Sequence, residues 1–166
     1  MFSGIFAALI TPFTKTGEVN KQAIKDSVDY LLSKGINGFY VCGGTGEGLL
    51  LTEKERNLVL DTTVSQVNHA VPVIAHVGAP STQEAEALAK HAAANGADAV
   101  ASIPPIYYSV GREGIVEYYR RLAEAAGNPV FFYNLPASTN FSLNADLAST
   151  LRSEEHTSEL QSPNTI

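Results

Sequence analysis

The sequence predicts an α/β protein whose strands form a parallel sheet. Short apolar runs recur roughly every 30 residues, which is the length of one strand followed by one helix. The runs are apolar along their whole length, as in strands covered on both faces, and the segments between them carry apolar residues at helical spacing. Strands that alternate with helices in this way form parallel sheets with right-handed crossovers.

Five runs are predicted as strands: residues 5–10, 38–42, 73–76, 99–103 and 130–133. Amphipathic helices are expected between them, at 21–33, at 53–67, and on the apolar stripes 85–93 and 115–123, and residues 144–151 are expected to begin a further helix. Capping boxes at Thr52 with Glu55 and at Ser81 with Glu84 support these assignments. Gly96 and Gly127 are expected to end helices before the next strand.

Two arrangements of these units fit the pattern. A full (β/α)8 barrel needs roughly 250 residues, so five units are either an incomplete barrel or a complete open sheet of the flavodoxin type. The second arrangement would make the chain a small binding module without enzymatic activity. In a curved partial barrel, Tyr133 and Thr45 would be directed at one axis, whereas an open sheet would give them no shared cavity.

The composition narrows the class of partner. The chain has 17 Asp and Glu against 11 Lys and Arg, a net charge of -6. This balance argues against nucleic acid or an anionic membrane and leaves a small-molecule substrate or a protein partner. No apolar run approaches the ~20 residues that cross a bilayer, and the N-terminus lacks a signal-peptide pattern. The protein is therefore expected in the cytoplasm, without nucleic acid or membrane as a partner.

Cysteine and histidine give no sign of a metal or cofactor site. The single cysteine, Cys42, suits a reducing compartment. Cys42 and His76 close predicted strands, and both are expected to be buried core residues rather than a nucleophile and a ligand. The remaining histidines show no metal-ligand spacing with one another or with Cys42, so no metal is expected.

Residues 152–166 break the pattern, because neither a helical stripe nor strand alternation runs through them. Residues 152–162 resemble the translation of a widely used sequencing-library adapter. We therefore predict that residues 1–151 are the native N-terminal part of a domain and that residues 152–166 are a non-native tail. A further alternative is that the whole chain is an assembly artefact without a biological role.

Three loops that follow predicted strands carry candidate functional groups. Residues 43–48, Gly-Gly-Thr-Gly-Glu-Gly, lead into a capped helix, so their amides can converge on an anion such as a carboxylate. They do not match the dinucleotide or P-loop fingerprints, and a tight strand-to-helix turn explains them equally well. Tyr107 and Tyr108 follow the fourth strand, and Tyr133 ends the fifth, where a barrel places proton-transfer groups. Ordinary aromatic packing is the alternative for Tyr107 and Tyr108, and a buried tyrosine whose hydroxyl is satisfied by the backbone is the alternative for Tyr133.

Five motifs, in order, resemble the dihydrodipicolinate synthase and N-acetylneuraminate lyase family. They are Ala-Ala-Leu-Ile-Thr-Pro-Phe at 7–13, Gly-Gly-Thr-Gly-Glu at 43–47, Ala-His-Val-Gly at 75–78, Pro-Ile-Tyr-Tyr at 105–108 and Tyr-Asn-Leu-Pro at 133–136. The resemblance covers residues 1 to about 151. It implies a partial (β/α)8 TIM barrel, roughly the first five βα units, and relatives that are usually homotetramers.

The resemblance implies class I aldolase chemistry, in which a lysine on the sixth strand forms a Schiff base with a 2-keto acid. By match of position, Gly44 and Thr45 would hold the substrate carboxylate and Tyr133 would be the proton shuttle. Tyr107 would extend the hydroxyl relay, and Tyr108 would contact the substrate or a subunit interface. The family lysine is expected near position 161, where this sequence has Gln161. We therefore expect this polypeptide itself to be inactive, with no cofactor.

Within the family, the resemblance favours N-acetylneuraminate lyase, which cleaves sialic acid to pyruvate and N-acetylmannosamine. Synthases of the lysine pathway carry an arginine where this chain has Ser138, while Ala137 and the motif at 75–78 are similar to the sialic-acid lyases. Gly44 stands where those lyases usually have a serine. A dihydrodipicolinate-synthase-like enzyme or a keto-deoxy sugar acid aldolase of the same family is therefore the alternative.

Overall fold

The computed structural model describes residues 2–153, with the side chain of Ser153 left out. These residues divide into two compact units. Unit 1 contains residues 2–76 and 94–98, and unit 2 contains residues 77–93 and 99–153. Most of the tail predicted at 152–166 lies outside the described residues, so the structure does not test that prediction.

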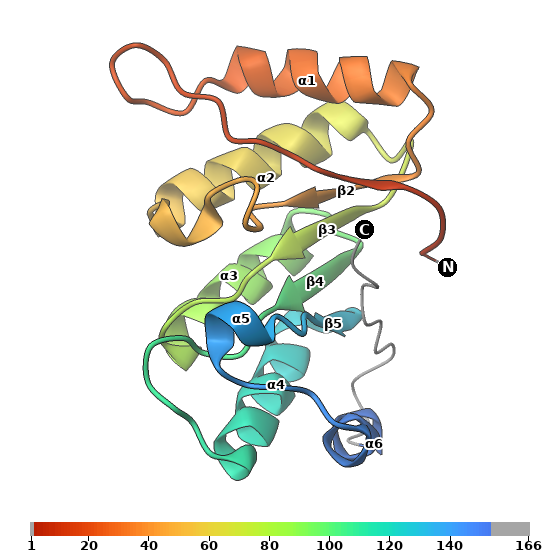
Figure 1. Ribbon diagram of the computed structural model, residues 1–166. Helices are drawn as coiled ribbons and strands as arrows, with labels where there is room; N and C mark the ends of the chain where they lie inside the picture. The colour runs from red at the N-terminus through yellow and green to blue at the C-terminus, as the bar shows by residue number, and fades with distance from the viewer. Residues whose placement is uncertain (1, 154–166) are drawn as a thin grey trace. The chain divides into compact units, whose positions relative to one another are not determined.

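Unit 1 contains three parallel strands and two helices, and the two helices lie side by side in the orange-to-yellow part of the ribbon (Figure 1). The strands are β1 (Phe6–Ala8), β2 (Gly38–Val41) and β3 (Val73–His76), and β2 lies between the other two. The helices α1 (Lys21–Ser33) and α2 (Glu53–Val67) pack against each other, and α2 also contacts β2 and β3. A 3-10 turn, η1 (Gly48–Leu50), precedes α2.

The strand order of unit 1 decides between the two predicted arrangements. In a flavodoxin-type sheet the first strand lies between the second and the third. Here Phe6 is opposite Gly38, and Phe39 is opposite Val73, so the second strand is the central one. The alternative of an open sheet of the flavodoxin type is therefore excluded, and sequential order is what a (β/α)8 barrel requires.

Unit 2 contains two parallel strands and four helices. The strands are β4 (Ala99–Ser102) and β5 (Val130–Phe132), paired with Val100 opposite Val130. The helices are α3 (Thr82–Ala94), whose last residue belongs to unit 1, α4 (Arg112–Ala126), α5 (Pro136–Thr139) and α6 (Ala145–Ser153). Helix α4 contacts both β5 and α6.

The predicted elements are all present, and the differences lie at their ends. The first strand was expected at 5–10 but pairs only over Phe6–Ala8, after which Leu9 donates one more hydrogen bond to Tyr40. Gly127 ends α4 in the left-handed conformation, as predicted. The last helix begins after Asn144, whose side chain caps the amide of Leu147 at 2.8 Å. The short helix α5 and the turn η1 were not predicted.

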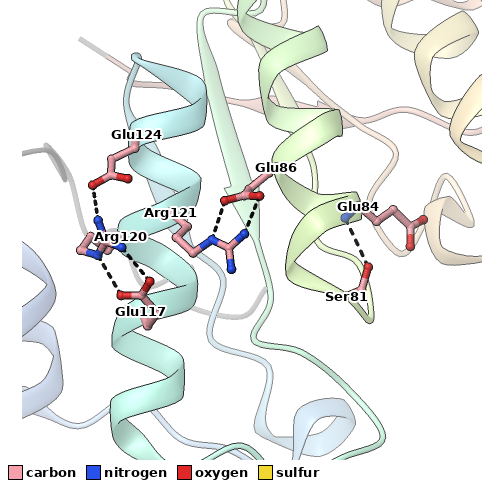
Figure 2. A network of polar contacts seen from close by, with 7 residues as sticks. All are labelled: Ser81, Glu84, Glu86, Glu117, Arg120, Arg121 and Glu124. Carbon is pink, nitrogen blue, oxygen red and sulfur yellow. Dashed lines mark hydrogen bonds and ion pairs between the residues drawn. The ribbon is translucent and has the colours of Figure 1, made fainter.

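Helix α2 begins with the predicted capping box. Thr52 Oγ1 accepts a hydrogen bond from the Glu55 amide at 3.3 Å, and the Glu55 carboxylate accepts one from the Thr52 amide at 2.8 Å. The Thr52 hydroxyl also donates to the Glu55 carboxylate at 2.7 Å, and this bond and the one from the Thr52 amide lower the pKa of Glu55 because they stabilise the ionised carboxylate. At the start of α3, Ser81 Oγ accepts from the Glu84 amide at 3.2 Å, which confirms the hydroxyl half of the second box (Figure 2).

An open groove about 450 Å³ in volume runs beside β1 in unit 1. One side is formed by the end of β1 and the residues after it, and the other by α1; the lining residues are Ala8, Leu9, Ile10, Asp26, Ser27, Tyr30 and Leu31. Ile10 is 53% exposed and Tyr30 is 61% exposed, so large apolar side chains border this groove. Of the two edges of β1, one is paired with β2 in the described part of the chain.

Two neighbouring arginines of α4, Arg120 and Arg121, differ in what their ion pairs connect (Figure 2). Arg121 makes a two-pronged contact with Glu86 of α3, at 2.6 and 2.8 Å, and the Glu86 side chain is mostly buried. Arg120 pairs with Glu117 and Glu124, which lie within one turn of it on α4 itself. The first contact joins two helices, whereas the second joins neighbours on one helix.

We expect the contact between Arg121 and Glu86 to couple more strongly than that between Arg120 and Glu117. Its fork geometry and partial burial reduce solvent screening, whereas an exposed local pair contributes little. Double-mutant cycles in urea with Arg121→Met and Glu86→Gln, and with Arg120→Met and Glu117→Gln as the matched control, measure both couplings. Equal couplings would contradict this account of how α3 and α4 are joined.

Candidate active site

The glycine loop of unit 1 is a tight turn with an exposed tip. It starts after Cys42, which has a left-handed φ of 58°, and it closes through two backbone hydrogen bonds. The amide of Glu47 donates to the Gly44 carbonyl at 3.1 Å, and the amide of Gly48 donates to the Gly43 carbonyl at 3.1 Å. These bonds fold the chain back on itself and leave Gly44 and Thr45 exposed to solvent.

The glycines of this loop are not equivalent. A Cβ at Gly48 would lie 1.8 Å from the carbonyl oxygen of Cys42, and one at Gly46 would lie 2.8 Å from the carbonyl oxygen of Leu9. A Cβ at Gly44 would meet nothing within 4 Å. Thr11 supports the turn from β1's side, because its hydroxyl donates to the Gly46 carbonyl at 2.7 Å. Sterics therefore require glycine at 46 and 48, while position 44 has room for a side chain.

Cys42 and His76 are buried core residues, as predicted. Burial raises the pKa of the Cys42 thiol to about 11, and the neighbouring Arg56 guanidinium opposes this shift only in part. Burial and, to a smaller extent, the positive charge of Arg56 together lower the pKa of His76 to about 3. Both groups are therefore neutral at neutral pH. Cys42 is not suited to act as a thiolate nucleophile, and His76 is not suited to act as a charged general acid.

Arg56 is a buried charge that the sequence analysis did not single out. It lies on α2 and is 3% exposed. Its Nη2 donates to the carbonyl of His76 at 2.7 Å, and its own carbonyl accepts a weak hydrogen bond from the Cys42 thiol at 3.7 Å. Arg56 therefore connects the end of β3 with the start of the glycine loop. In the sequence Arg56 follows three other charged residues at the start of α2, so no local pattern singles it out for this role.

The candidate tyrosines belong to unit 2 and follow its two strands. Tyr107 and Tyr108 lie in the loop after β4, are 90% and 77% exposed, and contact each other edge to face with ring centroids 4.8 Å apart. Tyr107 has a left-handed φ of 77°. Tyr133 follows β5 and is half-buried, and its amide donates to the carbonyl of Ser102 at 2.9 Å. Tyr107 and Tyr133 thus leave the carboxyl ends of two paired parallel strands.

The structure therefore places each predicted site residue in the segment that follows the carboxyl end of a strand. Gly44 and Thr45 follow β2 in unit 1, whereas Tyr107, Tyr108 and Tyr133 follow β4 and β5 in unit 2. This is the end of a parallel sheet at which barrel enzymes carry their catalytic groups. The individual roles assigned to these residues stay predictions.

Metal clusters and membrane-spanning helices are both absent from the described residues. Residues 2–153 contain no group of three His, Cys, Asp or Glu side chains that could hold a metal ion. No helix in that stretch has both the length and the apolar composition needed to cross a bilayer.

Comparison with known proteins decides the family. The model of the dihydrodipicolinate synthetase family matches residues 1–158. The chain belongs to this family. It is 38% identical over 143 residues to 4-hydroxy-tetrahydrodipicolinate synthase of Syntrophus aciditrophicus, covering 86% of this chain and 49% of that protein. It is 39% identical over 137 residues to N-acetylneuraminate lyase of Rhizobium meliloti, covering 82% of this chain and 46% of that protein.

Solved structures of this family share the fold. A catalytic-lysine mutant of the sialic acid aldolase of Ruminococcus gnavus superposes with a TM-score of 0.93 at 27% identity, covering 98% of this chain and 54% of that one. Dihydrodipicolinate synthase of Aquifex aeolicus gives 0.92 at 32% identity, covering 98% and 56%. The chain spans about half the length of the relatives it matches. It therefore has the predicted fold of a partial (β/α)8 barrel.

Substitutions in the glycine loop should show which glycines are required for steric reasons and which can be replaced by a larger residue. We expect Gly48→Ala to lower the free energy of unfolding by roughly 2–4 kcal/mol, because the methyl group meets a backbone carbonyl that cannot move cheaply. Gly44→Ala should change it by less than about 1 kcal/mol, since the site is open and the unfolded chain loses freedom. Urea unfolding followed by circular dichroism measures both, and similar losses would contradict the steric argument.

His76 should make the protein acid-sensitive. Below its ordinary pKa of about 6.5 the unfolded chain binds a proton that the folded state excludes until pH falls to about 3, so stability is lost as pH falls through this window. The loss is up to about 1.4 kcal/mol for each pH unit. The unfolding free energy of wild type should fall more steeply between pH 6.5 and 4 than that of His76→Gln. Parallel pH profiles would show that His76 is not held neutral.

Proposed function

We propose that the chain is the carboxylate-binding half of a class I aldolase or lyase that acts on 2-keto acids through a Schiff base. The supporting observation is the glycine loop, which presents Gly44 and Thr45 at an exposed tip after β2 in a chain that belongs to the dihydrodipicolinate synthetase family. Exposed backbone amides and a hydroxyl before a helix are suited to binding a carboxylate.

The tyrosines supply the proton-transfer part of the proposal. Tyr133 acts as the shuttle beside the imine, and Tyr107 extends the hydroxyl relay; Tyr108 contacts the substrate or a neighbouring subunit. A phenol can donate and accept in turn, which proton relay requires. The imine accepts the electron pair of the breaking carbon–carbon bond, leaving pyruvate as its enamine and releasing an aldehyde. In the synthetic direction the enamine adds to an aldehyde instead.

None of the lysines in residues 2–153 supplies the amine that forms the imine. Of these, Lys21 and Lys25 lie on α1, Lys34 caps it, and Lys54 and Lys90 lie on α2 and α3; Lys15 precedes α1. No described strand carries a lysine. The position expected for the family lysine is Gln161, outside the described residues. We infer that this polypeptide binds a keto acid without forming a covalent adduct.

For the substrate we propose sialic acid, which makes the parent activity N-acetylneuraminate lyase. Ser138, at an exposed position of α5, stands where lysine-pathway synthases carry a carboxylate-binding arginine. The similarity to the lyase of Rhizobium meliloti supports this choice. The second candidate is a dihydrodipicolinate-synthase-like enzyme or a keto-deoxy sugar acid aldolase, because relatives named as synthases are equally similar.

Pyruvate should bind the glycine loop reversibly. We expect it to shift the amide signals of Gly44 and Thr45 in nitrogen-15 NMR spectra, because loop amides hold the carboxylate. Thr45→Val, which keeps the side-chain shape but removes the hydroxyl, should weaken the effect. Borohydride reduction in the presence of pyruvate should leave the mass of the chain unchanged. An adduct on any lysine, or pyruvate shifts confined to residues outside the loop, would contradict the proposal.

A further inference from the structure

Two adjacent tyrosines of α4 hold the last residue of β4 in the core of unit 2. Tyr118, Tyr119 and Ser102 are all at most 2% exposed. The Tyr118 hydroxyl lies 2.8 Å from Ser102 Oγ, and the Tyr119 hydroxyl donates to the Ser102 carbonyl at 2.6 Å. One helix thus contacts both the side chain and the backbone of a strand end with two neighbouring phenols.

The hydrogen bonds around Ser102 have a fixed direction. Ser102 Oγ donates its only proton to the Ile103 carbonyl at 2.7 Å, so the proton between Ser102 and Tyr118 belongs to the tyrosine. The Ser102 carbonyl accepts from two donors, the Tyr119 hydroxyl at 2.6 Å and the Tyr133 amide at 2.9 Å. A carbonyl oxygen has two lone pairs, so these two donors satisfy it.

We infer that Tyr119 is a positioning residue for Tyr133, acting through the carbonyl of Ser102 that both of them bind. The inference rests on the proposed role of Tyr133 as the proton shuttle. The hydroxyl of Tyr119 holds the acceptor in place, and the acceptor fixes the backbone of Tyr133 at the point where the chain leaves β5. Proton transfer is sensitive to displacements of about 1 Å, so this backbone restraint matters for catalysis.

The ring of Tyr119 packs against two other aromatic rings. It stacks on Phe132, the residue before Tyr133, with centroids 4.5 Å apart and planes 25° apart. Tyr118 meets it edge to face at 5.2 Å. The ring therefore packs on the neighbour of Tyr133 while the hydroxyl reaches the acceptor of its amide. A phenylalanine would fill the same space, so the hydroxyl contributes the hold on the carbonyl and nothing to the packing.

The two tyrosines give a matched pair of variants. Tyr119→Phe removes a donor from the carbonyl that Tyr133 binds, whereas Tyr118→Phe removes a donor from the Ser102 side chain alone. Amide hydrogen exchange of the full chain, followed by NMR, compares them. We expect Tyr119→Phe to speed exchange at the Tyr133 amide about tenfold relative to the Val100 amide, which is the effect of losing one hydrogen bond. Tyr118→Phe should leave this ratio within about twofold.

The outcomes separate positioning from general stability. Equal ratios in the two variants, or exchange that rises evenly at every amide in Tyr119→Phe, would overturn the inference. If Tyr119→Phe does not fold, 3-fluorotyrosine at position 119 keeps the ring and makes the hydroxyl a stronger donor. The amide proton signal of Tyr133 should then move, and an unmoved signal overturns the inference. No substrate is needed, so failure here is distinct from failure of pyruvate to bind the loop.

Discussion

The glycine loop depends on one steric condition, which is that position 48 carries no side chain beside the carbonyl of Cys42. The two groups are so close that a Cβ would lie 1.8 Å from the oxygen. This contact lets the Gly48 amide close the turn on Gly43. The chain then passes from β2 through the exposed loop and the short turn η1 into the capped helix α2. Everything proposed for Gly44 and Thr45 requires this compact turn, because it is what places them at its tip.

Much of this arrangement could be predicted from local sequence. The capping box at Thr52 and the left-handed end of α4 at Gly127 depend on nearest neighbours in the chain, and the structure confirms both. The continuous apolar runs located all the strands. Local sequence leaves the flavodoxin-type alternative open, because the order of strands in a sheet depends on tertiary contacts. The pairing of β2 with both β1 and β3 excludes it.

What could not be predicted depends on side chains meeting across elements. In the sequence, Tyr118 and Tyr119 are two members of an apolar helical stripe, and nothing indicates that their hydroxyls reach β4. Arg56 likewise appears as one more charge near a helix start, whereas in the fold it is buried against the end of β3. The end of the first strand was overestimated, because residues 9 and 10 continue its apolar run after regular pairing has ended.

The groove beside β1 has a physical consequence for the molecule in solution. β1 is paired with β2 on one edge, and its neighbours Ile10 and Tyr30 expose more than half of their surface. In the described part of the chain the other edge of β1 is unpaired and bordered by apolar side chains, and such an edge can pair with a further strand. Charged residues or proline on an edge oppose this pairing. We therefore expect copies of the chain to associate first at this corner of unit 1 at high concentration, against the mutual repulsion of their acidic net charges.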